Sequence, residues 1–334
     1  MLSREANQVY WTGRYLERAE NLCRFIYVNL HYMMDMDIGD DHSWMALVQA
    51  TGDQKAFLDR YSQTDETSVM KFLTFDTENL NSMISCVRMA RENAKSLRST
   101  LSSTMWEDIN GIYWHTINHS KKKSQSINTE KFYSEFQKLY LQFLGSYHAT
   151  MTRNEAWHFL KAGIMMERAD KSARILDVKY FASLDYKAKS GNIFDSLMWR
   201  ALLKSVSALH MYRREFAHVN AQGVIDFLVG NPKFPRSMAF CIQEMKESLA
   251  AISFEVDPNE AEALTAALSK LIASIQKFNT ESTADVGIHD FIDSFQGALN
   301  QIDREIFELY FKVKEYEPTG NLSQMSQRQI QIQS

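Results

Sequence analysis

Residues 13–24, with the sequence GRYLERAENLCR, decide how this chain folds, because their pattern returns 150 residues later. Residues 163–174 read GIMMERADKSAR, so a glycine, a Glu-Arg-Ala triplet, an acid and a final arginine recur at a constant offset. Self-similarity at fixed spacing is the signature of an internal repeat. We therefore predict one helical domain over residues 1–317 with two related halves, 1–150 and 151–317.

Largely apolar side chains follow the same register in both copies. They recur at alternating steps of three and four residues, which places them on one face of a helix. The first copy carries Val9, Thr12, Leu16, Ala19, Cys23, Ile26 and Leu30, and the second carries Phe159, Ala162, Met166, Ala169, Ala173, Leu176 and Tyr180. Both segments are predicted to be long helices with one buried face.

The rest of the chain also favours helices. Its 334 residues include 12 Gly and 4 Pro, too few for the many turns of a strand-rich fold. We expect an all-α multi-helix bundle with two halves packed together and a disordered polar tail at 318–334. Beyond residues 3–34 and 153–182, helices are predicted over 43–61, 66–75, 78–97, 102–118, 129–148, 194–216, 222–229, 235–252, 258–278 and 289–313.

Charge and cysteine content argue against several classes of protein. The 37 basic and 41 acidic residues give a net charge of −4, without the basic character of nonspecific nucleic-acid binders. No apolar run approaches the ~18 residues of a membrane span, and no signal-peptide pattern follows Met1. The three cysteines are too scattered for a disulfide framework. We expect a cytoplasmic protein that binds neither nucleic acid nor membrane.

Charged side chains border the apolar face of both repeated helices. At about 100° per residue, the glycine, the acids and the final arginine of each copy share a narrow arc, in which each second acid has an arginine one turn later. Each glycine lets another backbone or a ligand approach, and the arginine of each Glu-Arg pair points toward a different neighbour. The candidate polar site consists of Gly13, Arg14, Glu17, Arg18, Glu20, Arg24, Gly163, Glu167, Arg168, Asp170 and Arg174.

Two interpretations of this arc stay open. In one, salt-bridged helices use partly buried charges to fix the register of the bundle. In the other, the two helices present Glu and Arg to one ligand in a shared pocket. Both require paired charges, so burial alone does not separate them. A solvent-reachable concavity would favour a ligand site, and close-packed, mutually paired charges would favour the structural role.

Other chemical patterns in the sequence are weaker. Two Glu-x-x-His pairs, at 155–158 and 215–218, lack the separate Glu helices that a di-iron site needs. The acidic segment 35–42 lacks the glycine and terminal glutamate of a calcium loop. Cys23 and Cys241 occupy apolar positions and are expected in the core. We therefore predict no metal and no cofactor.

The start of the chain, MLSREANQVYWTGRYLERAEN at residues 1–21, closely resembles the N-terminal signature of the bacterial Alpha-E proteins. That all-helical family is named for its Glu-Arg motif. Further resemblance is carried, in the expected order, by residues 90–98, 106–110, 167–170, 212–215 and 231–237.

The resemblance implies a role beside enzymes that form or cleave amide bonds. Genes of the family commonly neighbour a circularly permuted ATP-grasp ligase and a transglutaminase-like cysteine peptidase, so these are the expected partners. We therefore expect a non-catalytic binding or scaffold component that holds a partner or a peptide-like substrate through the polar arc, where Arg suits a carboxylate or phosphate and the acids suit an amine. The alternative is an enzyme that uses Glu17 or Glu167 as general base.

Overall fold

A computed structural model of the chain describes residues 1–36, 41–121, 129–190, 192–252, 258–278 and 287–312. This part of the chain is helical and contains no strand, which confirms the predicted all-α class. The helices of the first half are α1 (Ser3–Met36), α2 (Asp41–Thr51), α3 (Gln54–Leu58), α4 (Glu66–Met70), η1 (Lys71–Phe75), α5 (Met83–Ser96), α6 (Ser103–Ser120) and α7 (Thr129–Thr150). Those of the second half are α8 (Glu155–Ser190), α9 (Asn192–Ser205), α10 (Leu209–Glu215), α11 (Ala221–Gly230), α12 (Met238–Ile252), α13 (Pro258–Lys277), α14 (Gly287–Ile306) and η5 (Phe307–Phe311).

The same ring of four helices occurs in both halves. In the first half α1 contacts α5, α5 contacts α6, α6 contacts α7, and α7 returns to α1. In the second half α8, α12, α13 and α14 are connected in the same way. Short helices follow the first member of each ring: α2 to α4 in one half and α9 to α11 in the other. This shared connectivity agrees with two related halves, whose common origin stays a prediction.

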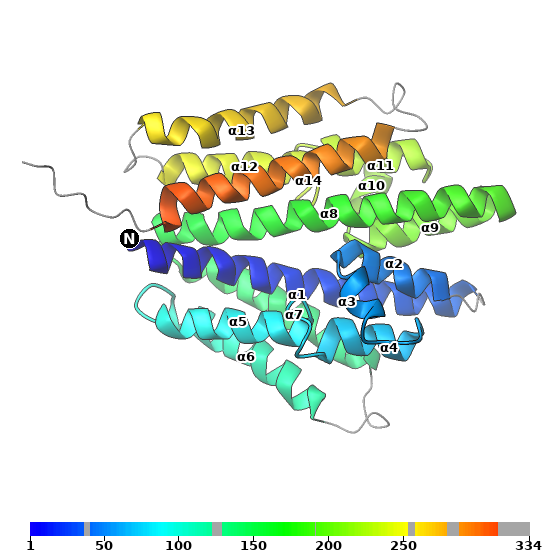
Figure 1. Cartoon of the computed structure of the whole chain (residues 1–334), viewed down its shortest axis with the longest axis horizontal. Coiled ribbons are helices and arrows are strands. Elements are labelled where there is room, and N and C mark those ends of the chain that lie inside the picture. Colours follow the sequence, from blue (N-terminus) through cyan, green and yellow to red (C-terminus); the bar gives the residue numbers. More distant parts are fainter. Residues whose placement is uncertain (37–40, 122–128, 191, 253–257, 279–286, 313–334) are drawn as a thin grey trace, which may run out of the picture.

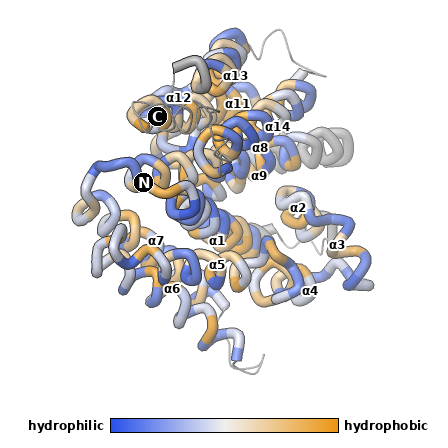
Figure 2. The backbone as a smooth tube through the Cα atoms, turned by 60° about the vertical axis from the view of Figure 1, so that its left-hand side comes forward, coloured by the Kyte–Doolittle hydropathy of each residue, from blue (hydrophilic) through white to orange (hydrophobic). Residues whose placement is uncertain are grey.

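Helices α1 and α8 form the seam between the two rings. They run side by side through the middle of the molecule, with α5 to α7 on one side and α12 to α14 on the other (Figures 1 and 2). The short helices cross this seam, because α2 packs on α8 and α9 packs on α1. The buried apolar residues form one cluster that includes side chains of both halves. The described helices of the two halves therefore share one core.

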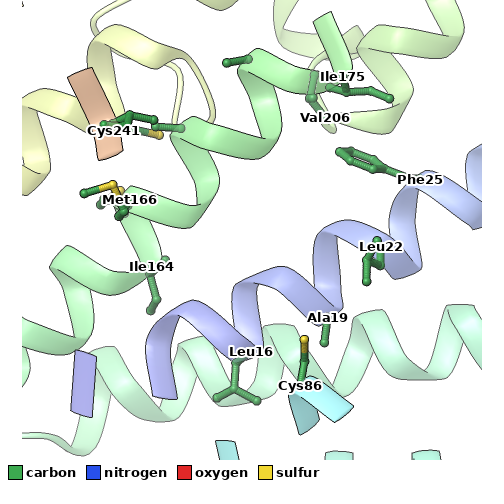
Figure 3. Close-up of a cluster of buried hydrophobic side chains, with 14 of the residues drawn as sticks. Leu16, Ala19, Leu22, Phe25, Cys86, Ile164, Met166, Ile175, Val206 and Cys241 are labelled. Atoms are coloured by element: carbon green, nitrogen blue, oxygen red, sulfur yellow. The ribbon is translucent and has the colours of Figure 1, made fainter. Parts of the chain in front are cut away.

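Side chains from both halves meet along the seam (Figure 3). Phe25 points from α1 toward Ile175 of α8 and Val206, while Ala19 faces the α5 side chain Cys86. All five are fully buried or nearly so. Ala19 belongs to the apolar face that the sequence repeat predicts and packs within its own ring, whereas Phe25 and Ile175, which join the two halves, lie outside that predicted face.

Four of the predicted helices have boundaries that differ in the structure. The predicted helix at 43–61 is broken at Gly52, whose φ of 80° ends α2, and the one at 194–216 is broken at Ser207, whose φ is 54°. Helix α5 begins at Met83 rather than at residue 78, because the Ser82 hydroxyl caps it. Helix α12 likewise begins at Met238, so Pro235 precedes the helix instead of occupying its first turn. The predicted polar tail lies outside the described residues.

Candidate functional site

The two Glu-Arg pairs of the repeat bind each other across the seam. Arg18 on α1 donates from Nε to Glu167 Oε1 at 2.6 Å and from Nη2 to Oε2 at 2.9 Å. Arg168 on α8 donates from Nε to Glu17 Oε1 at 2.9 Å and from Nη2 to Oε2 at 2.8 Å. Both contacts are bidentate, the geometry in which guanidinium binds carboxylate best. The glutamate of each motif is thus held by the arginine of the other.

Two glycines bring the helix backbones close enough for this exchange. A Cβ atom on Gly13 would lie 2.5 Å from the Leu160 carbonyl oxygen, and one on Gly163 would lie 2.1 Å from the Tyr10 carbonyl oxygen. Real Cβ contacts are never this short, so only glycine fits at either position. Position 160 is position 10 plus 150, so the approach is reciprocal, like the ion pairs. The predicted close approach of another backbone is confirmed at both glycines.

Each motif glutamate also binds a second cation, which comes from a different place in each half. Arg236, from the segment before α12, donates to Glu17 Oε1 at 2.7 Å. Lys171, one turn along α8, lies 3.6 Å from Glu167 Oε1. The Tyr140 hydroxyl on α7 also donates to Glu17. Glu17 and Glu167 are therefore each surrounded by several donors.

The second acid of each copy makes the predicted ion pair with the arginine one turn later. Glu20 Oε1 lies 3.1 Å from Arg24 Nη1, and Asp170 Oδ1 lies 2.9 Å from Arg174 Nε. Arg236 links the first of these pairs to Glu17, because its Nη2 lies 3.1 Å from Glu20 Oε2. We call Glu17, Glu20, Arg24, Arg168 and Arg236 the Glu17 cluster.

The opposite cluster also reaches α14. Arg14 donates from Nε to Glu167 Oε2 at 3.0 Å and from Nη1 to Asp303 Oδ1 at 2.8 Å. The Tyr10 hydroxyl donates to the same Asp303 oxygen at 2.7 Å. The Glu167 cluster consists of Arg14, Arg18, Glu167, Asp170, Lys171, Arg174 and Asp303. Four of its members lie on α8 and two on α1, so it ties the seam to the last helix.

Both motif glutamates are ionised at neutral pH. Their side chains are 0% exposed, and burial alone would raise the pKa of each. Arg168 and Arg236 outweigh burial and hold the pKa of Glu17 well below its usual range. Arg18 does the same for the pKa of Glu167, with help from the other cations of its cluster. A general base needs a pKa near the working pH and room for a substrate proton, and these carboxylates have neither.

Every predicted site residue lies in one of the two clusters or at the glycine crossing. The clusters contain all nine charged candidates, and the close-packed pairing favours the structural interpretation. Arg24 differs from the others because it also lines a cavity. Among the contributors that sequence reasoning missed are Tyr140, Lys171, Arg236 and Asp303.

A second internal echo points to one of these missed residues. The sequence SMISC at 82–86 returns as SMAFC at 237–241, and Arg236 directly precedes the second copy. In both copies the serine hydroxyl donates to a carbonyl oxygen six residues earlier, that of Asp76 or Asn231. The side chain before each serine is thereby aimed at the seam, where Asn81 accepts from Arg18 at 2.6 Å and Arg236 reaches Glu17.

The remaining chemical patterns do not form a reactive centre among the described residues. There, no group of three or more His, Cys, Asp or Glu is placed to hold a metal ion. Cys23, Cys86 and Cys241 are all buried, and burial raises the pKa of Cys86 and of Cys241 to about 12. Much of the acidic 35–42 segment lies outside the described residues. No described helix combines the length and the hydropathy that crossing a bilayer requires.

Comparison with known protein families gives one match. Residues 1–311 match the model of Alpha-E, described as a predicted alpha-helical domain with a conserved ER motif. No curated protein and no solved structure matches the chain. The match covers both copies of the Glu-Arg pair, so it spans both rings of helices and the seam between them.

Proposed function

This chain belongs to the Alpha-E family, and we propose that it is a non-catalytic binding or scaffold component of a peptide ligation or modification system. Its partners in that proposal are a circularly permuted ATP-grasp ligase and a transglutaminase-like peptidase, the enzymes that its family resemblance implies. Its ligand is one of these enzymes or a peptide-like substrate.

The observation that carries the proposal is the crossed pairing of Glu17 with Arg168 and of Glu167 with Arg18. Glu17, Glu167 and Arg168 are buried and Arg18 is partly buried, and the partner of each comes from the other half. Removing one member of a buried ion pair typically costs about 3–5 kcal/mol, because the other charge is left without compensation. Such pairs fix one arrangement of the two rings of helices. A protein that serves as a binding platform needs a fixed interior of this kind.

The buried position of the arc revises how binding takes place in this proposal. A partner protein cannot contact side chains that the two helices cover, so the Glu-Arg pairs support the binding surface from inside. The general-base alternative is disfavoured for the same reason, since Glu17 is fully covered and bound by Arg168, Arg236 and Tyr140.

Binding to the neighbouring ATP-grasp protein tests the proposal. The purified chain is immobilised, its affinity for that protein and for the transglutaminase-like protein is measured, and a thermal melt is recorded for each variant. We expect the wild-type chain to bind at least one of the two. Glu167→Gln is expected to lower the melting temperature and to weaken binding only as far as it lowers the folded fraction.

Three outcomes would overturn parts of this account. A wild-type chain that binds neither protein contradicts the accessory role. Loss of binding in Glu167→Gln with an unchanged melt makes the arc itself a contact site. Turnover of an amide substrate by the chain alone, abolished by Glu17→Gln in a folded protein, supports the enzyme alternative.

A further inference from the structure

A cavity of about 430 Å³ opens beside the Glu17 cluster, between α1, α7 and the turn that joins α9 to α10. Its polar lining consists of Arg24, Tyr27, His31, Gln137, Lys204, Ser207 and His210. Val28 and Leu209 complete the lining, so none of the nine lining residues is acidic. One carboxylate lies near the rim, where Glu130 sits 3.4 Å from His31 Nε2, but its side chain is 65% exposed. The wall of the cavity is therefore rich in cations and hydrogen-bond donors.

Arg24 connects this cavity to the interior of the protein. It is 3% exposed, and it donates from Nε to the Ser205 carbonyl oxygen and from Nη2 to Asn21. Its Nη1 atom lies 3.1 Å from Glu20 but outside hydrogen-bonding geometry, so that atom makes no hydrogen bond among the described residues. A buried guanidinium with an unused donor is costly unless another acceptor reaches it.

The Glu17 cluster contains one more positive charge than negative charges. Its described side chains are two glutamates and three arginines, so the cluster carries a formal charge of +1. Arg24 sits at the carboxyl end of α9, whose dipole supplies roughly half a negative charge. The remaining excess faces a cavity that also presents Lys204 and two histidines. An anion in this cavity would balance it.

Two further observations agree with an anion at this position. Burial, together with the neighbouring Arg236, lowers the pKa of Arg24 to about 10, and a nearby anion would reverse that shift. Gln137 Nε2 is buried beside the Cys23 thiol, which is its hydrogen-bonding neighbour, and it donates to no oxygen of the described residues. A thiol is a weak acceptor, so an oxyanion at this cavity wall would be a better partner for the amide.

We propose that this cavity binds an oxyanion, a carboxylate or a phosphate group, through Arg24, Gln137 and Lys204. The guanidinium and the amide supply donors from inside, and the ammonium closes the outer side. The inference does not depend on the proposed function. If that function is correct, the ligand would be the carboxyl terminus of a peptide or an acyl phosphate made from it.

Binding of small oxyanions to the full-length chain tests this directly. Calorimetric titrations at constant ionic strength use inorganic phosphate, a short acetylated peptide with a free carboxyl terminus, and the same peptide amidated. We expect at least one of the first two probes to bind and the amide not to bind. Binding of the free peptide identifies a carboxylate site, and binding of phosphate alone identifies a phosphate site.

Variants of exposed lysines provide the control. Lys204→Glu reverses the charge at the cavity and is expected to raise the Kd at least tenfold, whereas Lys55→Glu on α3 makes the same change on another exposed lysine and is expected to leave it unchanged. Gln137→Leu, which removes the inner amide, is also expected to weaken binding. The proposal is overturned if neither oxyanion binds, or if Lys204→Glu and Lys55→Glu behave alike. A failure here leaves partner binding untouched, so the two proposals fail separately.

Discussion

At the scale of single residues, the two clusters compensate the charge of their motif glutamates with cations from different positions. Lys171 occupies the position on α8 that Asn21 occupies on α1, and Arg236 occupies the position before α12 that Asn81 occupies before α5. Besides its Arg168 partner, Glu17 thus receives Arg236 from the segment before α12, whereas Glu167 receives Lys171 from its own helix and Arg14 from α1 in addition to Arg18. The additional cations come from different positions in the two halves.

The different positions of Lys171 and Arg236 predict a compensating pair of substitutions. Arg236→Asn removes a cation from Glu17 and is expected to cost roughly 2–3 kcal/mol of unfolding free energy, because Arg168 still pairs with that glutamate. Adding Asn21→Lys restores a cation at the position that Lys171 uses but removes the acceptor of Arg24 Nη2, so it should recover about 1 kcal/mol at most. Urea unfolding of both single variants and the double variant measures this. A double variant as unstable as the sum of the singles would show that Lys at 21 does not reach Glu17.

The buried carboxylates also predict how stability depends on pH. The folded-state pKa of Glu167 lies below its unfolded value, because arginines outweigh the effect of burial. Its contribution to stability is therefore complete above about pH 5 and is lost as the pH falls through and below the unfolded pKa near 4.3. Glu167→Gln should lower the melting temperature at pH 7. Between pH 6 and pH 4, however, the melting temperature of this variant should fall less than that of the wild type. The exposed Glu92→Gln is the control, and equal acid sensitivity in all three proteins would refute this.

At the scale of elements, the crossing of α1 and α8 depends on two glycines. Gly163→Ala would place a methyl group 2.1 Å from a backbone oxygen of the other helix, and backbone cannot move aside as a flexible side chain can. We expect a loss of about 3 kcal/mol or more. Gly297→Ala on α14 meets nothing within 4 Å and should instead add about 0.5–1 kcal/mol through helix propensity. Equal effects of the two substitutions in chemical denaturation would contradict the close crossing.

The turn after α9 uses a serine where glycine is the usual residue. Ser207 has a φ of 54°, and the bonds from Ser207 N to Lys204 O and from Ala208 N to Leu203 O close a Schellman motif around it. A side chain in this conformation costs roughly 1–2 kcal/mol. Ser207→Gly should therefore raise the unfolding free energy by about 1 kcal/mol, measured by thermal melts, while Ser207→Ala should not. A stabilising alanine would show that the backbone there is unstrained.

Sequence periodicity predicted the elements better than their ends. Two long helices with one apolar face follow directly from the repeat, and so do the (i, i+4) ion pairs of Glu20 and Asp170. Spacing alone does not give the direction or distance at which two helices cross, so the exchange between Glu17 and Glu167 could not be derived. The break at Ser207 was missed because apolar spacing continues through it, and Arg236 was missed because it lies outside the two repeated Glu-Arg segments.

At the scale of the whole molecule, charge pairing and apolar packing bind the same two halves. The rings share one core, the short helices α2 and α9 each pack on the first helix of the other half, and the Glu-Arg pairs are exchanged at the centre. Two halves that each complete the other are expected to unfold together. The Glu-Arg motif thus holds the two halves in one arrangement. Binding is left to the outer surfaces of the molecule and to the cavity at Arg24.

The most direct test of this account is the coupling free energy between Glu17 and Arg168, residues 151 positions apart in sequence. Urea unfolding of Glu17→Gln, Arg168→Met and the double variant gives this value as a double-mutant cycle. We predict a coupling of about 2 kcal/mol or more, because the pair is buried and bidentate. The account is contradicted if the unfolding free energies lost in the two single variants add up to the loss in the double variant within roughly 0.5 kcal/mol. Such additivity would mean that the two side chains do not meet.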